Sequence, residues 1–233
     1  MLLEDINDLQ VRFQKGQRTR IVAFGSSNTD RRIHGLHWFD WCDLGIKQTY
    51  GRVVHSINAG TGGDTTRDLL RRWDEDVALY QPHAVFITIG GNDANPEKDL
   101  GADEYRANLH TLVQRVRALG AVPILQTYYA ADLAGLGELH ASSFQRNMHI
   151  IRDVACAESC EVVDHHARWE PVRLQHPHVF AGLMIDALHI NPLGNTIMGL
   201  DLIRRFGVHL DPDQQAFTAA ARGIQALMDE LTS

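Results

Sequence analysis

The chain has 233 residues, a hydrophobic content of 44% and a formal net charge of −7. This length and composition allow one large buried core and show no sign of a second part, so we expect a single domain over residues 1–233. No basic stripe offsets the acidic balance, which argues against a nucleic-acid surface, and no apolar run is long enough to span a membrane.

Cysteine usage and the amino terminus bear on the cellular compartment. The three cysteines, Cys42, Cys156 and Cys160, cannot all pair with one another. Acidic residues, Glu4 and Asp5, interrupt the amino terminus before a signal-peptide core can form. We therefore expect a soluble, reduced, cytoplasmic protein.

Apolar runs and helical periodicities alternate along the chain, and five of the runs predict strands. In the first half we expect a helix over residues 2–13, a strand at about 20–24, a helix in the second half of 33–50, a strand at 53–57, a helix through 69–77 and a strand at 84–89. In the second half we expect a helix over 103–119, a strand at 122–127, a helix over 139–158, a strand at 161–164 and an irregular stretch over 165–184. A helix from Pro192, with Asn191 as its cap, and a last helix over 213–231 follow. This alternation predicts an α/β fold, a three-layer α/β/α sandwich around a mostly parallel five-stranded sheet.

Glycines and small polar residues follow each of the first three predicted strands. The three stretches are Gly25-Ser26-Ser27, Gly60-Thr61-Gly62-Gly63 and Gly90-Gly91-Asn92-Asp93. The carboxyl ends of parallel strands meet at one edge of a sheet, and open α/β sheets bind their ligands there. We therefore expect these loops to lie together.

A second feature precedes the helix at Pro192, where Asp186 stands three residues before His189. In a turn, such an aspartate can hold imidazole Nδ1 and leave Nε2 free for a serine. Serine hydrolysis needs a nucleophile, a base, a group that orients the base, and donors for the oxyanion. The chain supplies a serine, a glycine loop, Asn92 and the Asp186–His189 pair, which together predict a catalytic site.

On these motifs the chain resembles the SGNH hydrolase superfamily, also called GDSL esterases and lipases, over nearly its whole length. Four blocks of that family carry Ser, Gly, Asn and His in this order. They match Ser27 after Gly25, Gly63 in the second glycine loop, Asn92 after Gly91, and His189 with Asp186. The resemblance implies a flavodoxin-like fold, which agrees with the alternation of strands and helices.

The resemblance also implies a carboxylic ester hydrolase that transfers an acyl group to water through an acyl-enzyme. Ser27 would attack the ester carbonyl, with His189 as its base and Asp186 orienting the imidazole. The backbone N–H groups of Ser27 and Gly63, with the side chain of Asn92, would form the oxyanion hole. Neither a metal nor an organic cofactor is required, and the partner is a small acyl-ester substrate.

Position 26 departs from the family pattern, which has Asp between the glycine and the nucleophile. Ser26 stands there, so the chain has two adjacent candidate serines. The family register assigns the attack to Ser27, and we expect the Ser26 hydroxyl to be a local hydrogen-bond partner for the turn. The Gly-x-Ser-x-Gly elbow is absent, which disfavours an ordinary α/β-hydrolase.

Two other classes of function stay open at this level. A metallohydrolase could use His165-His166 and His176-x-His178, although these spacings match no common zinc motif. A non-catalytic binding module could use the same fold, because fold does not fix function.

The sequence indicates the substrate less directly than it indicates the reaction. Members of the family cleave acetyl groups from sugars, short acyl esters, thioesters and lysophospholipids. The candidate pocket walls are Tyr128, Tyr129 and Trp169, and no long apolar lid is present. These features favour a short-acyl, above all acetyl, esterase over a lysophospholipase or a thioesterase, and the pattern makes no prediction of oligomeric state.

Overall fold

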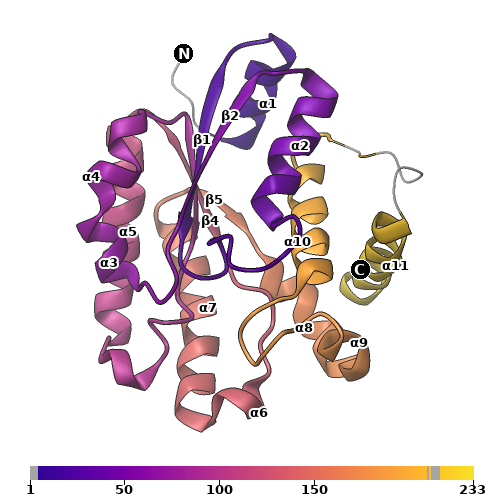
Figure 1. Cartoon of the computed structure of the whole chain (residues 1–233). Helices are drawn as coiled ribbons and strands as arrows, with labels where there is room; N and C mark the ends of the chain where they lie inside the picture. The colour runs from indigo at the N-terminus through magenta and orange to yellow at the C-terminus, as the bar shows by residue number, and fades with distance from the viewer. Residues whose placement is uncertain (1–4, 209, 211–215) are drawn as a thin grey trace.

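The computed structural model describes residues 5–208, 210 and 216–233. In this part of the chain five strands form one sheet in the order β2-β1-β3-β4-β5, with helices on both faces (Figure 1). Each neighbouring pair of strands is parallel. The predicted three-layer α/β sandwich is confirmed, with a sheet that is parallel throughout.

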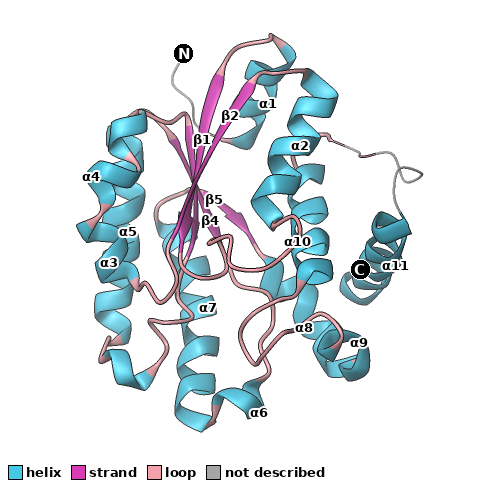
Figure 2. Cartoon of the chain, viewed as in Figure 1, coloured by secondary structure: helices cyan, strands magenta, loops and turns pink. Residues whose placement is uncertain are grey.

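The bounds of the elements follow the predicted alternation closely (Figure 2). The strands are β1 Thr19–Gly25, β2 Val54–Gly60, β3 Ala84–Thr88, β4 Val122–Gln126 and β5 Glu161–Val163. The α-helices are α1 Ile6–Gln14, α2 Trp38–Tyr50, α3 Thr66–Arg71, α4 Trp73–Asp76, α5 Ala102–Ala118, α6 Leu133–Leu136, α7 Glu138–Ala157, α8 His165–Gln175, α9 Pro177–Ala181, α10 Pro192–Arg204 and α11 Ala216–Thr232. Two short 3-10 helices are η1 Ala78–Tyr80 and η2 Pro96–Lys98.

Side chains of the central strands enter two separate cores, because successive residues of a strand point to opposite faces. On β1, Ile21 and Ala23 pack beneath α1, α2, α8 and α10, whereas Val22 and Phe24 pack beneath α3, α4, α5 and α7 (Figure 1). Both faces of the strand are therefore covered. This explains why β1 and β3 are continuous apolar runs in the sequence.

The register of the three strands β2, β1 and β3 brings their ends to one level. Gly25 at the end of β1 pairs with Gly60 on β2 and with Thr88 on β3. The loops that follow these strands therefore leave the same edge of the sheet. At Gly60 a Cβ atom would collide with the backbone of Thr29 and Asp30, so only glycine lets the first two loops pack this closely.

Two predictions about helices were wrong. The stretch 165–184 is not irregular, because it contains α8 and α9. The carboxylate of Asp164 caps α8 by accepting the N–H of Ala167, and the buried Trp169 anchors the helix to the core. Pro171 lies inside α8 and gives the stretch the composition of a loop.

The second error concerns the expected helix through 69–77, which is two short helices. Arg72 separates α3 from α4, with φ −95° and ψ 11°. Parts of two further predictions, residues 2–4 of the first helix and 213–215 of the last, lie outside the described residues. None of the helices in the described part of the chain combines the length and the apolarity needed to cross a membrane.

Candidate active site

Three side chains that are distant in the sequence form one hydrogen-bonded chain at the carboxyl edge of the sheet. Ser27 follows β1, and Asp186 and His189 lie in the turn before α10. The Oγ of Ser27 is 2.8 Å from Nε2 of His189, and Nδ1 of His189 is 2.8 Å from Oδ2 of Asp186. In this arrangement an imidazole can take a proton from a hydroxyl while a carboxylate holds its other nitrogen.

The turn itself keeps the carboxylate of Asp186 ionised. Its Oδ1 accepts the backbone N–H of Leu188 at 2.9 Å and that of His189 at 2.8 Å. Burial raises the pKa of Asp186, but the hydrogen bonds from Leu188 and His189 outweigh it and hold the pKa below its usual value. Asn191 then caps α10 by accepting the N–H of Gly194, as the sequence predicted, and this fixes where the turn ends.

The two adjacent serines have different environments. The Oγ of Ser26 is fully buried and lies 2.9 Å from the hydroxyl of Tyr128, whereas the Oγ of Ser27 contacts His189. The Ser26 hydroxyl is a hydrogen-bond partner, but its partner comes from the loop after β4 and not from the turn. The turn is closed by its backbone, because the carbonyl of Ser26 accepts the N–H groups of Thr29 and Asp30.

The predicted oxyanion donors lie on three loops of the same edge. Gly63 lies in the loop after β2 with φ +85°, a value that favours glycine. The N–H groups of Ser27 and Gly63 donate to no other residue in the described part of the chain. Asn92 follows β3 and donates one N–H of its amide to the carbonyl of Asp64 at 2.8 Å, which leaves the second N–H available.

A buried tyrosine links the side chain of Asn28, next to Ser27, to the turn that holds His189. The Tyr129 hydroxyl lies 2.6 Å from the carbonyl of Leu188, accepts the N–H of Ile190 at 3.1 Å, and contacts the side-chain amide of Asn28. These partners are the direct neighbours of His189 and Ser27. Tyr129 therefore holds the two side chains at a fixed separation.

The prediction that three aromatic residues form the walls of the substrate pocket was wrong. Tyr128, Tyr129 and Trp169 are all buried in the core, with exposed fractions of 1%, 1% and 0%. They line no open pocket and support the loops from beneath. The sequence offers no sign of this role, because burial depends on which elements pack together.

Comparison with known proteins shows the family of this chain. Residues 23–197 match the model of the GDSL-like lipase/acylhydrolase family. The chain belongs to this family. It is therefore a carboxylic ester hydrolase, as the sequence predicted.

Individual known proteins are similar to this chain over most of its length. The acetylxylan esterase of Geobacillus stearothermophilus is 29% identical over 163 residues, which cover 66% of this chain and 73% of that protein. The isoamyl acetate-hydrolyzing esterase 1 homolog of Mus musculus is 24% identical over 209 residues, covering 78% and 79%. The crystal structure of Axe2, an acetylxylan esterase from Geobacillus stearothermophilus, superposes with a TM-score of 0.72 at 25% identity and covers 84% of this chain and 97% of that one.

A small cavity adjoins the hydroxyl of Ser27. Its volume is about 80 Å³, and its walls include Ile33, His37, Ile185 and His189. On the same measure a single water needs about 10–15 Å³, so the cavity accepts a group of only a few heavy atoms.

The histidine pairs that suggested a metal site have other surroundings. No three His, Cys, Asp or Glu side chains are grouped to hold a metal ion within residues 5–208, 210 and 216–233. His165 is fully buried, and this burial lowers its pKa to about 3. Its Nε2 lies 3.0 Å from Oε1 of Gln126, so a neutral imidazole donates to the amide within the core.

Proposed function

We propose that this protein is a serine esterase that removes short acyl groups, above all acetyl, from small esters through an acyl-enzyme on Ser27. The observation that carries the proposal is the hydrogen-bonded chain from Ser27 through His189 to Asp186. Structures of Axe2 described as catalytic mutants replace a serine, an aspartate or a histidine, and that aspartate precedes the histidine by three residues. Asp186 and His189 have the same spacing here.

In the first half of the reaction, Ser27 Oγ attacks the ester carbonyl and its proton passes to Nε2 of His189. The carbonyl oxygen becomes an oxyanion that the N–H groups of Ser27 and Gly63 and the amide of Asn92 stabilise. The carboxylate of Asp186 faces the imidazolium and offsets its charge. Collapse of the intermediate breaks the bond to the alcohol, which leaves with the proton from Nε2, and the acyl group stays on Ser27.

In the second half, water replaces the alcohol. Nε2 of His189 takes a proton from this water as its oxygen attacks the acyl carbon, and the same donors bind the second oxyanion. The bond to Ser27 Oγ then breaks, and Oγ recovers its proton from Nε2. The products are a carboxylic acid and the free serine, so each half uses and restores the same proton carrier.

The small cavity supports a short acyl group. At about 80 Å³, it has room for the methyl of an acetyl ester beside the nucleophile. The relatives bear names of enzymes that act on acetyl esters, acetylxylan and isoamyl acetate. A lysophospholipase or a thioesterase of the same family remains the alternative, and the substrate series below separates these cases.

The test begins with turnover of 4-nitrophenyl acetate, butyrate and octanoate. We expect kcat/KM to be highest for the acetate, while a maximum at octanoate would contradict the short-acyl assignment. Acetyl-coenzyme A and a lysophosphatidylcholine provide the thioester and lysophospholipid arms. Absence of turnover on every ester would favour the non-catalytic binding module.

The matched pair Ser27→Ala and Ser26→Ala then identifies the nucleophile. Ser27→Ala should abolish turnover and labelling by an organophosphonate, because the attacking oxygen is gone. Ser26→Ala should keep measurable turnover and lose on the order of 1 kcal/mol of stability with the Tyr128 hydrogen bond. A phosphonate adduct on Ser26 in the tryptic peptide would contradict the assignment.

A further inference from the structure

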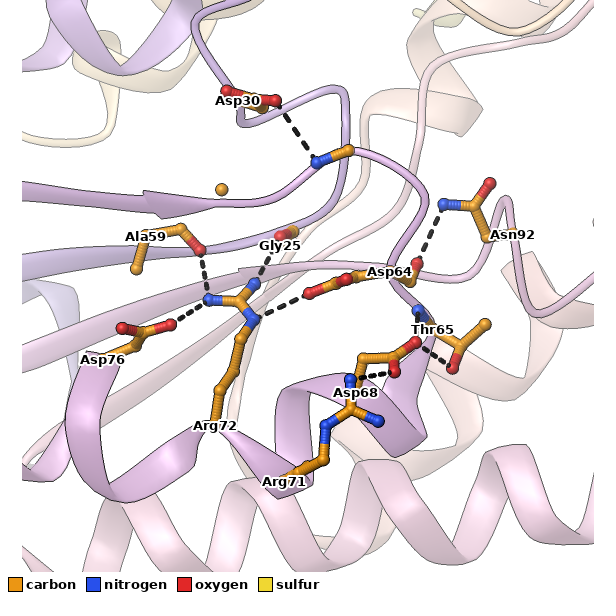
Figure 3. Close-up of polar contacts among 12 residues, drawn as sticks. Gly25, Asp30, Ala59, Asp64, Thr65, Asp68, Arg71, Arg72, Asp76 and Asn92 are labelled. Carbon is orange, nitrogen blue, oxygen red and sulfur yellow. Dashed lines mark hydrogen bonds and ion pairs between the residues drawn. The ribbon is translucent and has the colours of Figure 1, made fainter.

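One arginine beneath the glycine loop has no role in the chemistry proposed so far. Arg72 lies between α3 and α4, and only 15% of its side chain is exposed. Its guanidinium stacks 4.5 Å above the ring of Phe24. Figure 3 shows that it also reaches four oxygen acceptors at once. An arginine this well enclosed has a fixed position, because the planar group can satisfy so many acceptors in only one orientation.

The four acceptors belong to different segments. Nη2 donates to the carbonyl of Gly25 at 2.9 Å, and Nη1 donates to the carbonyl of Ala59 at 2.8 Å. Nε donates to the carboxylate of Asp64 at 2.7 Å, and Nη1 also donates to that of Asp76 at 2.7 Å. Arg72 therefore connects the end of β1, the end of β2, the loop after β2 and helix α4.

Two of these contacts are close to the proposed oxyanion donors. Gly25 stands two residues before Ser27, and Asp64 follows Gly63 directly. The carbonyl of Asp64 also accepts the amide N–H of Asn92 at 2.8 Å (Figure 3). Arg72 thus contacts residues next to the donors of Ser27 and Gly63, and it is linked to the side-chain amide of Asn92 through Asp64.

Hydrogen bonds fix the two ends of this loop: the N–H of Thr61 donates to the carbonyl of Gly25 at 3.1 Å, and the N–H and hydroxyl of Thr65 donate to the carboxylate of Asp68 at 2.9 Å. We call residues 61–65 the glycine loop; residues 61, 62 and 63 are exposed, and no atom lies within 4 Å of the place where a Cβ of Gly63 would be. On its outer side one hydrogen bond, from the N–H of Gly62 to Asp30 at 3.2 Å, ties it to the serine loop. Packing does not fix Gly63, so its position depends on polar neighbours such as Asp64.

Loss of the arginine would free the middle of this loop, between the hydrogen-bonded ends at Thr61 and Thr65. Without Arg72 the carboxylate of Asp64 would be partly buried and unpaired, a state that a charged group leaves by turning toward water. That movement would carry the N–H of Gly63 and the acceptor of Asn92 away from their places. An oxyanion hole loses much of its effect when a donor is displaced by about 1 Å.

We propose that Arg72 is a positioning residue that holds the oxyanion donors in place through Asp64, Gly25 and Ala59. The inference rests on the proposed function, because it assigns Arg72 to the oxyanion hole of that reaction. Arg72 touches no substrate and acts only through its neighbours. Its loss affects the transition state, where the oxyanion exists, more than substrate binding.

The two carboxylates bound to Arg72 provide a matched pair of variants. Asp64→Ala and Asp76→Ala each remove one ion pair from the same guanidinium, but Asp64 lies in the glycine loop and Asp76 lies on α4. With 4-nitrophenyl acetate we expect Asp64→Ala to lower kcat about tenfold at nearly constant KM, and Asp76→Ala to stay within about twofold of the unchanged protein. Arg72→Lys keeps the charge but cannot reach both carbonyls and Asp64 together, so kcat should again fall by about tenfold or more.

A second readout separates positioning from loss of folding. Phenylboronic acid becomes tetrahedral when it bonds to Ser Oγ, so its inhibition constant reports the oxyanion site of the folded molecules alone. For Asp64→Ala and Arg72→Lys we expect this constant to rise in step with the fall of kcat, while for Asp76→Ala it should not change. Measuring Asp64→Ala keeps the inference testable if Arg72→Lys does not fold.

The possible results are distinct. If the wild-type protein is active and the Asp64→Ala and Arg72→Lys variants fold and keep full kcat and boronate affinity, this inference is overturned and the proposed function stays intact. Equal losses in Asp64→Ala and Asp76→Ala, or a change confined to KM, would also overturn it and assign Arg72 a purely structural role. If the wild-type protein neither hydrolyses esters nor binds the boronate, both the proposed function and this inference are contradicted.

Discussion

The two flanks of Ser27 are supported by different chemistry. On one flank, the glycine loop is tied down by charged groups, with Arg72 bound to Asp64 and Asp30 bound to Gly62. On the other flank, the base turn, residues 186–190, is tied to the core by the neutral hydroxyl of Tyr129. Both supports fix backbone next to a functional group.

The difference follows from the side chains that each segment can bury. In the base turn, Leu188 and Ile190 are buried, with exposed fractions of 9% and 2%, and their packing already restricts the backbone. One hydroxyl suffices to complete the restriction. The glycine loop has no large apolar side chain to bury, so its stabilisation comes from ion pairs and hydrogen bonds. A loop that needs bare backbone N–H groups at its surface therefore depends on electrostatic anchors.

The largest expected effect lies on the base turn. Asp186→Asn should lower kcat about 10⁴-fold, because the amide no longer stabilises the imidazolium or holds the tautomer that accepts a proton from Ser27. An asparagine oxygen can still accept the N–H of Leu188, so the turn should stay folded. Turnover of 4-nitrophenyl acetate and circular dichroism provide the measurements. A loss smaller than tenfold would show that Asp186 has no such role.

The next effect lies on the oxyanion flank. Asn92→Ala should lower kcat roughly 10²- to 10³-fold with little change in KM, because the amide matters most when charge develops on the carbonyl oxygen. Steady-state kinetics on the same ester give both constants. If stability falls and kcat of the folded fraction does not, Asn92 merely anchors the loop through the carbonyl of Asp64.

A smaller effect tests whether the base turn needs its hydroxyl. Tyr129→Phe leaves the buried N–H of Ile190 and the carbonyl of Leu188 without their partner, which should cost on the order of 2 kcal/mol of unfolding free energy and about tenfold in kcat. Tyr128→Phe is the control, since its hydroxyl contacts Ser26, Asn28 and Gly91 but no residue of the base turn, and its loss should cost about 1 kcal/mol with little loss of kcat. Urea unfolding and kinetics measure both variants, and similar kcat values in the two would refute a positioning role for Tyr129.

The smallest effect is the change of the unfolding free energy with pH. Its sign should differ between two buried groups, Asp93 and His165. Burial raises the pKa of Asp93 to about 6, against the hydrogen bonds from Thr66 that lower it. The native state therefore binds a proton between about pH 6 and pH 4 that the unfolded chain does not bind. This group adds stability on acidification, on the order of 1 kcal/mol from pH 7 to pH 5, and loses it again as pH rises through 6.

His165 should act in the opposite direction. Burial lowers its pKa to about 3, so below about pH 6.5 the unfolded chain binds a proton that the native state refuses. Stability is lost as pH falls, on the order of 2 kcal/mol from pH 7 to pH 5. In urea unfolding at these two pH values, His165→Gln should reduce the acid loss and Asp93→Asn should enlarge it. Equal pH dependence in both variants and the unchanged protein would contradict the assignment.

The sequence predicted the strands of the sheet correctly, because local patterns of apolar residues and glycines determine them. The apolar runs that end in glycine identified β1, β2 and β3, and Asn191 before Pro192 marked the start of α10 correctly. The stretch from 165 to 184 failed because Pro171 and several polar residues outweighed the cap at Asp164. Local composition cannot show that Trp169 draws this segment into the core.

In the candidate site, too, the sequence predicted some residues and missed others. The Asp-x-x-His spacing and the polar ends of strands indicated the residues that the structure brings together, Ser27, His189 and Asp186. The sequence analysis missed Arg72 and Tyr129, because important partners of both side chains are backbone atoms. The carbonyl of Gly25 that binds Arg72, and that of Leu188 beside Tyr129, leave no trace in a sequence.

The contact between Gly60 and the backbone of Thr29 and Asp30 has a consequence for protein engineering. Because no side chain fits there, the serine loop and the end of β2 behave as a single rigid piece, and a mutant library that varies position 60 would consist largely of misfolded protein. Diversity aimed at new substrates belongs instead on the lining of the small cavity. Ile33 and Ile185 line it, half-exposed and exposed respectively, so they can change its size without disturbing the join between the two loops.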